Sequence, residues 1–321
     1  VSSGAFAPVL YQDSPDPWYM AKNCFPQKLG VFALTEARRA HRYSDGAEIL
    51  VPAVRIVENG AVRMLVEAEF VWGRSQLVQT YCLPKAGTSF EIMQDIFWNE
   101  ADTMLKLEIP AAFKGDYLGQ GMFGSGSLPQ DGTECVSQKW CGLFGEKHAL
   151  TICNSGIYGS HCVGSTVSLS LLRASAYAAH PIGARPLVQE ERFIPRMDQG
   201  EHHLHFTICG GDAEVRRKRV DMEAQVLNEA PFIFSAFPSG EGTMPKPMLL
   251  LSEPCVQLTA MYYDQQKESY VIRLWNSQPD AVTTVVRLPV WNAVQEVSLG
   301  AYQFQTYKIR ADGSLEPTPP I

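Results

Sequence analysis

Residues 138–180 read QKWCGLFGEKHALTICNSGIYGSHCVGSTVSLSLLRASAYAAH, and this stretch decides how the chain folds. It contains the turn sequence NSGIYG at 154–159, followed by an apolar strand that ends with LLR at 171–173. The glycines at 156 and 159 tolerate positive φ angles, so the chain can turn tightly here. The pattern predicts a glycine-flanked turn that pushes Tyr158 outward ahead of a buried strand.

Elsewhere the chain is dominated by a two-residue alternation of apolar and polar side chains. In VRMLVEAEF at 62–70 the even positions are apolar and the odd positions mostly polar, as a half-buried strand requires. The alternation recurs at 270–274 and 282–288, with turn sequences such as ENG at 58–60 between such segments. Short strands separated by frequent turns are typical of β-sandwiches. We therefore expect a mostly β fold.

One helix is expected at about 213–228. Asp212 can accept hydrogen bonds from the first backbone N–H groups of this helix. Apolar residues at 220, 224 and 227 follow helical spacing, and Pro231 prevents continuation. The basic run RRKR at 216–219 is expected on a solvated face of the helix.

This helix is expected to bridge two β domains. We predict a large domain over residues 1–230, then a linker and a small C-terminal β-sandwich over residues 231–321. The proline-rich linker lies around 238–247, and the strands of the small sandwich begin at about 249. The tail at 317–320 is expected to be too rich in proline to fold.

Composition excludes several classes of protein. The 321 residues carry a net charge of −7, which argues against nucleic-acid binding, since that requires a basic face. No window approaches the ~18 apolar residues of a membrane span, and the first residues do not resemble a signal peptide. Eight cysteines with irregular spacing and no CxxC pair are expected to be reduced thiols in a cytoplasmic protein.

Ten short motifs occur in an order that resembles the C-terminal half of bacterial alpha-mannosidases of glycoside hydrolase family 38. Each motif is weak alone, whereas ten in sequence are specific. They are DSPDPW at 13–18, VRIVENGAVR at 54–63, WNE at 98–100, MLKL at 104–107, YLGQ at 117–120, QKW at 138–140, LLR at 171–173, HPIG at 180–183, PRMDQGE at 195–201 and AQVLNE at 224–229. Ser155 departs from the family pattern, which usually has Asp at this position of the turn.

The resemblance implies a galactose-mutarotase-like supersandwich, followed by a smaller β-sandwich. It also implies a retaining alpha-mannosidase that uses two carboxylates and a zinc ion held by two Asp and two His. Those motifs are absent from this chain, so no catalytic or metal-binding residue is expected in it. The chain alone is expected to be inactive and to complete the active site of an N-terminal catalytic domain of the same polypeptide.

The substrate would be an alpha-mannoside or an oligosaccharide, and a homo-oligomer is left open. The alternative reading is a stand-alone carbohydrate-binding or mutarotase-like module. An epimerase of that kind needs a His acid and a Glu base facing one sugar oxygen. In this chain that pair would be His203 or His205 with Glu134 or Glu201.

The candidate substrate-binding residues are Tyr158, Asn154, Arg173, Arg196 and Asp198. A phenol can stack on a sugar ring and hydrogen-bond its oxygens, and an Arg at a strand end can reach a sugar hydroxyl. For Arg196 and Asp198, an internal ion-pair network is favoured over sugar contact.

Histidines offer a second reading. His203 and His205 would lie on one face of a strand, where they could hold a metal with Glu201 or Asp198, but a polar strand face is favoured. A lone histidine such as His161 is expected to be a structural hydrogen-bonding residue.

Overall fold

The computed structural model of the chain describes residues 4–17, 23–177, 193–229, 231–233, 242, 245–266 and 268–319. Trp18 and the motif at 180–183 lie outside these residues. The chain forms two compact units, one of residues 1–119 and 127–213 and one of residues 120–126 and 214–321. The described residues contain many strands and one helix, so the predicted mostly β fold is confirmed.

The first unit contains a six-stranded antiparallel sheet. Its strands, in the order in which they pair, are β13 (Cys135–Val136), β16 (Gly159–Val163), β17 (Thr166–Arg173), β10 (Thr103–Pro110), β1 (Ala7–Gln12) and β2 (Lys28–Val31). The apolar strand predicted before LLR is therefore β17, and it pairs along most of its length with β10.

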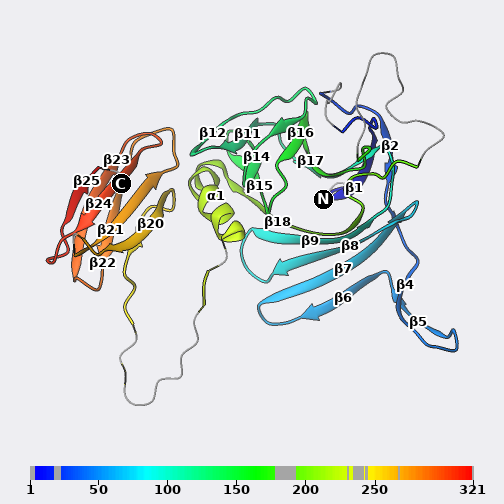
Figure 1. Ribbon diagram of the computed structural model, residues 1–321, viewed down its shortest axis with the longest axis horizontal. Coiled ribbons are helices and arrows are strands. Elements are labelled where there is room, and N and C mark those ends of the chain that lie inside the picture. Colours follow the sequence, from blue (N-terminus) through cyan, green and yellow to red (C-terminus); the bar gives the residue numbers. More distant parts are fainter. Residues whose placement is uncertain are drawn as a thin grey trace. The chain divides into compact units, whose positions relative to one another are not determined.

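A ten-stranded sheet faces it. Its strands, in pairing order, are β12 (Gly124–Ser127), β11 (Asp116–Gly121), β14 (Trp140–Phe144), β15 (His148–Asn154), β18 (Gly200–Asp212), β9 (Ser89–Trp98), β8 (Ser75–Pro84), β7 (Arg63–Trp72) and β3 (Ala33–Leu34), and β6 (Val54–Asn59) also pairs with β7. Figure 1 shows β6 to β9 and β18 side by side. A separate hairpin consists of β4 (Ala37–Arg42) and β5 (Glu48–Pro52).

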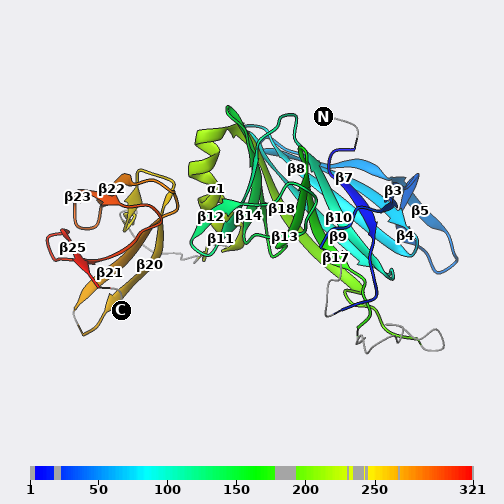
Figure 2. The same ribbon diagram turned by 90° about the horizontal axis from the view of Figure 1, so that it is seen from above.

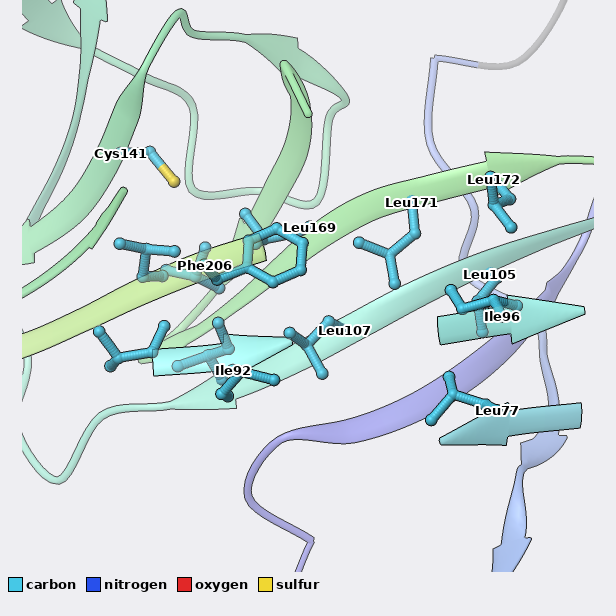
Figure 3. Packing of buried hydrophobic residues seen from close by; sticks show 14 of the residues in the cluster. Leu77, Ile92, Ile96, Leu105, Leu107, Cys141, Leu169, Leu171, Leu172 and Phe206 are labelled. Atoms are coloured by element: carbon cyan, nitrogen blue, oxygen red, sulfur yellow. The ribbon is translucent and has the colours of Figure 1, made fainter. Parts of the chain in front are cut away.

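The main core lies between these two sheets. Leu107 and Leu169 come from the six-stranded sheet and Ile92 and Phe206 from the ten-stranded sheet, and all four are at most 1% exposed (Figure 3). Side chains alternate across a strand, so the odd-numbered residues of β10 enter this core and the even-numbered ones face the opposite side. The outer face of β10 therefore carries Lys106 and Glu108.

The alternation at 62–70 correctly predicts a strand, but the burial that it predicts is wrong at two positions, Val62 and Glu69. Val62 precedes β7 in the turn after β6 and is exposed. Glu69 is buried, where its carboxylate accepts a hydrogen bond from Gln76. The hydrogen bond from Gln76 on the neighbouring strand thus lets Glu69 be buried where the alternation predicts an exposed residue.

The second unit contains a smaller β-sandwich (Figure 2). One sheet has β19 (Leu250–Leu251), β22 (Val282–Leu288) and β23 (Ala293–Leu299), and the other has β20 (Val256–Asp264), β21 (Ser269–Asn276), β24 (Phe304–Ile309) and β25 (Leu315–Thr318). Ile272, Leu274, Val286 and Leu299 are buried in its core.

The prediction that the proline-rich tail does not fold is wrong for its first residues. Pro317 lies in β25 opposite Tyr307. A sheet accepts proline on an edge strand because no neighbour needs its missing N–H, and β25 is the edge of this sheet.

Helix α1 (Ala213–Asn228) has the predicted bounds. Val220 and Ala224 are buried on one side of it, as their spacing predicts. The solvated face expected for the basic run is wrong at Arg216, which is buried and forms an ion pair with Glu223. Within the described part of the chain, no helix has the length and apolar character needed to cross a membrane.

Candidate functional site

The turn that carries Tyr158 is held by the side chain of Asn154. The Asn154 Oδ1 atom accepts hydrogen bonds from the backbone N–H groups of Gly156 and Ile157, at 3.1 and 2.8 Å. Its Nδ2 donates to the Gln138 carbonyl at 2.9 Å. Gly156 has a φ of 108°, which favours glycine. Asn154 is buried and shapes the turn, while Tyr158 is 51% exposed, so the phenol is presented outward as the sequence predicts.

Arg173, at the end of β17, is held by carboxylates. Its Nε and Nη2 atoms donate to Asp13 over 2.5 and 3.2 Å, and its backbone N–H donates to Asp198 over 3.0 Å. The Asp13 side chain is 2% exposed and that of Arg173 is 21% exposed. The structure therefore brings two predicted site residues, Arg173 and Asp198, into direct contact.

Arg196 lines a cavity in the first unit. Its guanidinium donates to both carboxylate oxygens of Asp102, over 3.1 and 3.0 Å. The cavity has a volume of about 610 Å³, and Arg74, Glu100, Phe193 and Gln199 also line it. Apolar, aromatic and charged groups therefore meet at this cavity, as in small-molecule sites in general. Arg196 has both an internal ion pair and access to the cavity.

Two of the predicted site residues, Tyr158 and Arg173, lie at the same end of a strand pair. Strands β16 and β17 pair antiparallel, with Ser160 opposite Leu169. Tyr158 immediately precedes β16 and Arg173 ends β17, so both lie at the same end of this pair. The side chain of Arg173 contacts Asp13 and, within the described part of the chain, makes no recorded contact with Tyr158.

The histidine face on β18 is built of ion pairs. His203 Nδ1 lies 2.6 Å from Asp95, and His205 Nε2 lies 3.0 Å from Glu91. The hydrogen bond from His205 holds the pKa of Glu91 below its usual 4.5. Each histidine is thus satisfied by a carboxylate on the neighbouring strand β9, as expected for a polar strand face.

A buried polar cluster was missed by the sequence interpretation. Lys106 is 0% exposed; its Nζ atom donates to Glu134 and also to Ser170 Oγ, at 2.7 Å. Ser170 Oγ donates to the second oxygen of Glu134 over 2.7 Å, and His161 Nδ1 lies 3.0 Å from the first. Glu134, suggested above as a partner of His203 or His205, therefore bonds His161 instead.

Burial and charge act in opposite directions in this cluster. Burial raises the pKa of Glu134, but the hydrogen bond from His161 and the charge of Lys106 outweigh it and hold this pKa below 4.5. Burial lowers the pKa of Lys106 against the opposing charge of Glu134. The carboxylate of Glu134 is thus ionised at neutral pH.

Residues 7–181, more than half of the chain, match the sequence profile of the glycosyl hydrolases family 38 C-terminal domain. The chain belongs to glycosyl hydrolase family 38. The matched region covers β1 to β17 and so includes the Tyr158 turn, Arg173 and the buried cluster around Glu134.

Two solved structures share the fold of this family 38 chain. The first is the crystal structure of an alpha-mannosidase from Enterococcus faecalis V583, with a TM-score of 0.70 and 12% identity. The second is a protein in glycosyl hydrolase family 38 from Enterococcus faecalis, with a TM-score of 0.72 and 12% identity. Each match covers 94% of this chain, which spans only 38% and 40% of the length of the two proteins. None of the curated protein sequences matches the chain.

Zinc, which the family resemblance implies, does not fit the residues that the structure describes. Among the described residues, no group of three or more His, Cys, Asp or Glu side chains is arranged to hold a metal ion. Of the three histidines on β18, His203 and His205 are each bonded to a different carboxylate, and His202 contacts the backbone carbonyl of Asp198. That the zinc ligands lie in another part of the polypeptide remains a prediction.

Proposed function

We propose that this chain is the C-terminal β region of a retaining, zinc-dependent alpha-mannosidase, and that it completes a sugar pocket whose catalytic groups lie in another domain. The observation that carries this proposal is the family match over residues 7–181. The fold shared with a bacterial alpha-mannosidase over 94% of the chain supports it. Its partners would be the catalytic domain of the same polypeptide and an alpha-mannoside or oligosaccharide.

The side chains of this family 38 region are suited to binding rather than to bond cleavage. Tyr158 offers an exposed phenol on a turn that Asn154 holds in place, so little ordering is needed when it meets a sugar. Arg196 lines a cavity while Asp102 fixes the plane of its guanidinium. A retaining glycosidase also needs a carboxylate nucleophile and an acid–base carboxyl, which we assign to the other domain.

A reducing compartment suits the thiols of this chain. All eight cysteines are free, and most of them are buried. Disulfides persist in oxidising compartments and are rare in the cytosol. We therefore place the parent enzyme in the cytoplasm.

The decisive experiment compares the complete polypeptide with a version that lacks this chain. Hydrolysis of an aryl alpha-mannoside is measured for both, with and without a chelator, together with the stereochemistry of the released sugar. We expect activity only in the complete polypeptide, loss of that activity on chelation, and retention of configuration. Full activity without this chain, or activity that survives chelation, would contradict the proposal.

The alternative of a stand-alone module is tested with the isolated chain. We expect no turnover of aryl mannosides and no exchange of sugar anomers by this chain. Anomer exchange observed by NMR with the purified chain, lost on changing Glu134 or Glu201, would favour a mutarotase-like function instead.

A further inference from the structure

A second cavity lies on the outer face of the six-stranded sheet. Its volume is about 290 Å³, and Tyr11, Phe25, Lys28, Glu108, His161 and Ser168 are among the residues that line it. It shares no lining residue with the cavity at Arg196. The residues come from six parts of the chain that the sheet brings together, namely β1, the segment before β2, β2, β10, β16 and β17.

The alternation of side chains explains why this face is polar. In β10 and β17 the odd-numbered leucines enter the main core, so Glu108 and Ser168 take the opposite face together with Lys106 and Ser170. An outer face with a structural role alone would carry only apolar residues under its covering segment. Here an apolar cluster of Val9, Tyr11, Phe25 and Met104 lies beside the buried charge of Lys106.

His161 offers an unused hydrogen-bonding atom to this cavity. The imidazole is 5% exposed, and its Nδ1 atom lies 3.0 Å from the carboxylate of Glu134. An ionised carboxylate only accepts, so Nδ1 carries a proton, and in the neutral imidazole Nε2 presents a lone pair. Among the described residues, Nε2 has no hydrogen-bond partner. A hydroxyl of a ligand that enters the cavity can therefore donate to this nitrogen.

The charges around the cavity cancel in pairs. Lys28 Nζ lies 2.5 Å from Glu108, and Lys106 pairs with Glu134. The hydroxyl of Tyr11 donates to Glu108, so this carboxylate is satisfied from two sides. A net charge on a ligand would therefore find no uncompensated partner here. Hydroxyl groups, which both donate and accept, match the remaining polar groups of the lining, which are the Thr166 hydroxyl and the His161 imidazole.

The size and the lining of the cavity restrict the kind of ligand further. A cavity of about 290 Å³ lies at the lower end of the range of small-molecule sites, roughly 300–1,000 Å³. The rings of Tyr11 and Phe25 give it apolar walls, which suit the C–H face of a sugar ring. We propose that this cavity binds one neutral, hydroxyl-rich ring of monosaccharide size, with His161 Nε2 accepting a hydrogen bond from a ligand hydroxyl.

Binding to the 321-residue chain tests this proposal without any need for catalysis. Methyl alpha-mannoside, glucosamine and glucuronate are titrated separately, and saturation-transfer NMR and the imidazole resonances of His161 report binding. We expect the neutral glycoside to bind and to shift the His161 resonances, with both charged sugars at least tenfold weaker. Absence of binding by the neutral glycoside, or preference for a charged sugar, would overturn the proposal.

Two variants place the ligand in this cavity. His161→Gln should weaken binding at least tenfold, whereas His203→Gln, at an exposed histidine with a similar carboxylate bond, should leave it unchanged. Lys28 lies at the more exposed mouth of the cavity. Lys28→Met should leave the negative charge of Glu108 uncompensated and so shift the binding preference toward glucosamine. If His161→Gln does not fold, the Lys28→Met preference decides. Unchanged selectivity in Lys28→Met would then count against the site.

A last comparison distinguishes a free monosaccharide from the end residue of a glycan as the source of the bound sugar ring. A free monosaccharide and the end residue of a glycan have the same ring chemistry, so a mannobiose is titrated beside methyl alpha-mannoside. Equal affinity assigns the site to a chain end, and at least tenfold weaker binding of the disaccharide assigns it to a free sugar.

Discussion

The guanidinium of Arg173 donates two hydrogen bonds to the carboxylate of Asp13, which lies 160 residues earlier in the chain. This pair ties the end of β17 to the segment that follows β1. Because the carboxylate is almost completely buried, Arg173 is committed to an internal contact. Arg173, like Asn154, therefore has a structural role among the predicted sugar-binding residues.

The first prediction concerns this ion pair. Asp13→Asn should destabilise the first unit by about 1.5–3 kcal/mol, because it weakens hydrogen bonds to a charged group and leaves a half-buried guanidinium without its counter-charge. Urea denaturation measures the loss. The matched control is Asp116→Asn on the exposed start of β11, which should change stability by less than about 0.5 kcal/mol. Equal effects of the two variants would show that the Arg173 pair contributes nothing.

The second prediction separates Tyr158 from its structural neighbours. In the complete enzyme, Tyr158→Phe should lower kcat/KM by about a few-fold to tenfold, the worth of one neutral hydrogen bond of about 0.5–1.5 kcal/mol. The melting temperature should not change, because the phenol is half exposed. Tyr43→Phe, at a tyrosine of similar exposure, should alter neither quantity. An early melting transition with unchanged kcat/KM would assign Tyr158 to the fold.

Local patterns predicted those features of this family 38 chain that local contacts determine. The bounds of α1 follow from helical spacing and from a proline beyond its end, and both signals lie within a few residues of the helix. The exposure of Tyr158 was predicted from glycines 156 and 159, of which only Gly156 has a positive φ, and the side chain of Asn154 holds the turn. In each case the residues that cause the structure are neighbours in the sequence.

Features that depend on side-chain partners outside the local pattern escaped the same reasoning. Arg216 belongs to a basic run, yet it is buried and paired with Glu223, seven residues later in the same helix. Glu134 lies in a turn-rich segment with no periodic pattern, and its partners are 27 to 36 residues away. The one local signal was Lys106 between two core leucines, which shows that β10 has a second, covered face.

The third prediction concerns the thiols. Burial raises the pKa of Cys141 to about 12, and it also raises the pKa of the partly exposed Cys135. Thiolates are the reactive species, so alkylation by iodoacetamide at neutral pH should be slow at both. Cys24, which is partly exposed, should react first. Peptide mass spectrometry over time gives the order, and rapid labelling of Cys141 in the folded chain would contradict it.

The fourth prediction tests the buried pair of Lys106 and Glu134. Glu134→Gln should cost about 3–5 kcal/mol at pH 7, because it leaves the Lys106 ammonium buried without a counter-charge. Lys106→Met removes the charge that would be left, so Lys106→Met combined with Glu134→Gln should cost less than the sum of the single changes. For residues in direct contact this difference is about 0.5–3 kcal/mol. Simple additivity in urea denaturation would show that the two side chains act independently.

The same pair should make stability depend on pH in a definite direction. The folded-state pKa of Glu134 lies below its usual 4.5, so its contribution is fully present above that pH and is lost as the pH falls through the folded pKa. The cost of Glu134→Gln should therefore be constant from pH 7 to about 5 and shrink below pH 4, where the wild-type carboxylate becomes protonated.

Lys106 should make the stability of the protein depend on pH in the alkaline range. Burial lowers its pKa below 10.5, so the penalty for its buried charge disappears as the pH rises from its folded pKa to its unfolded one, and stability rises there. Urea denaturation of wild type and Glu134→Gln across this range measures both effects. A cost of Glu134→Gln that grows as the pH falls below 4 would mean that the folded state raises the pKa of Glu134 instead of lowering it.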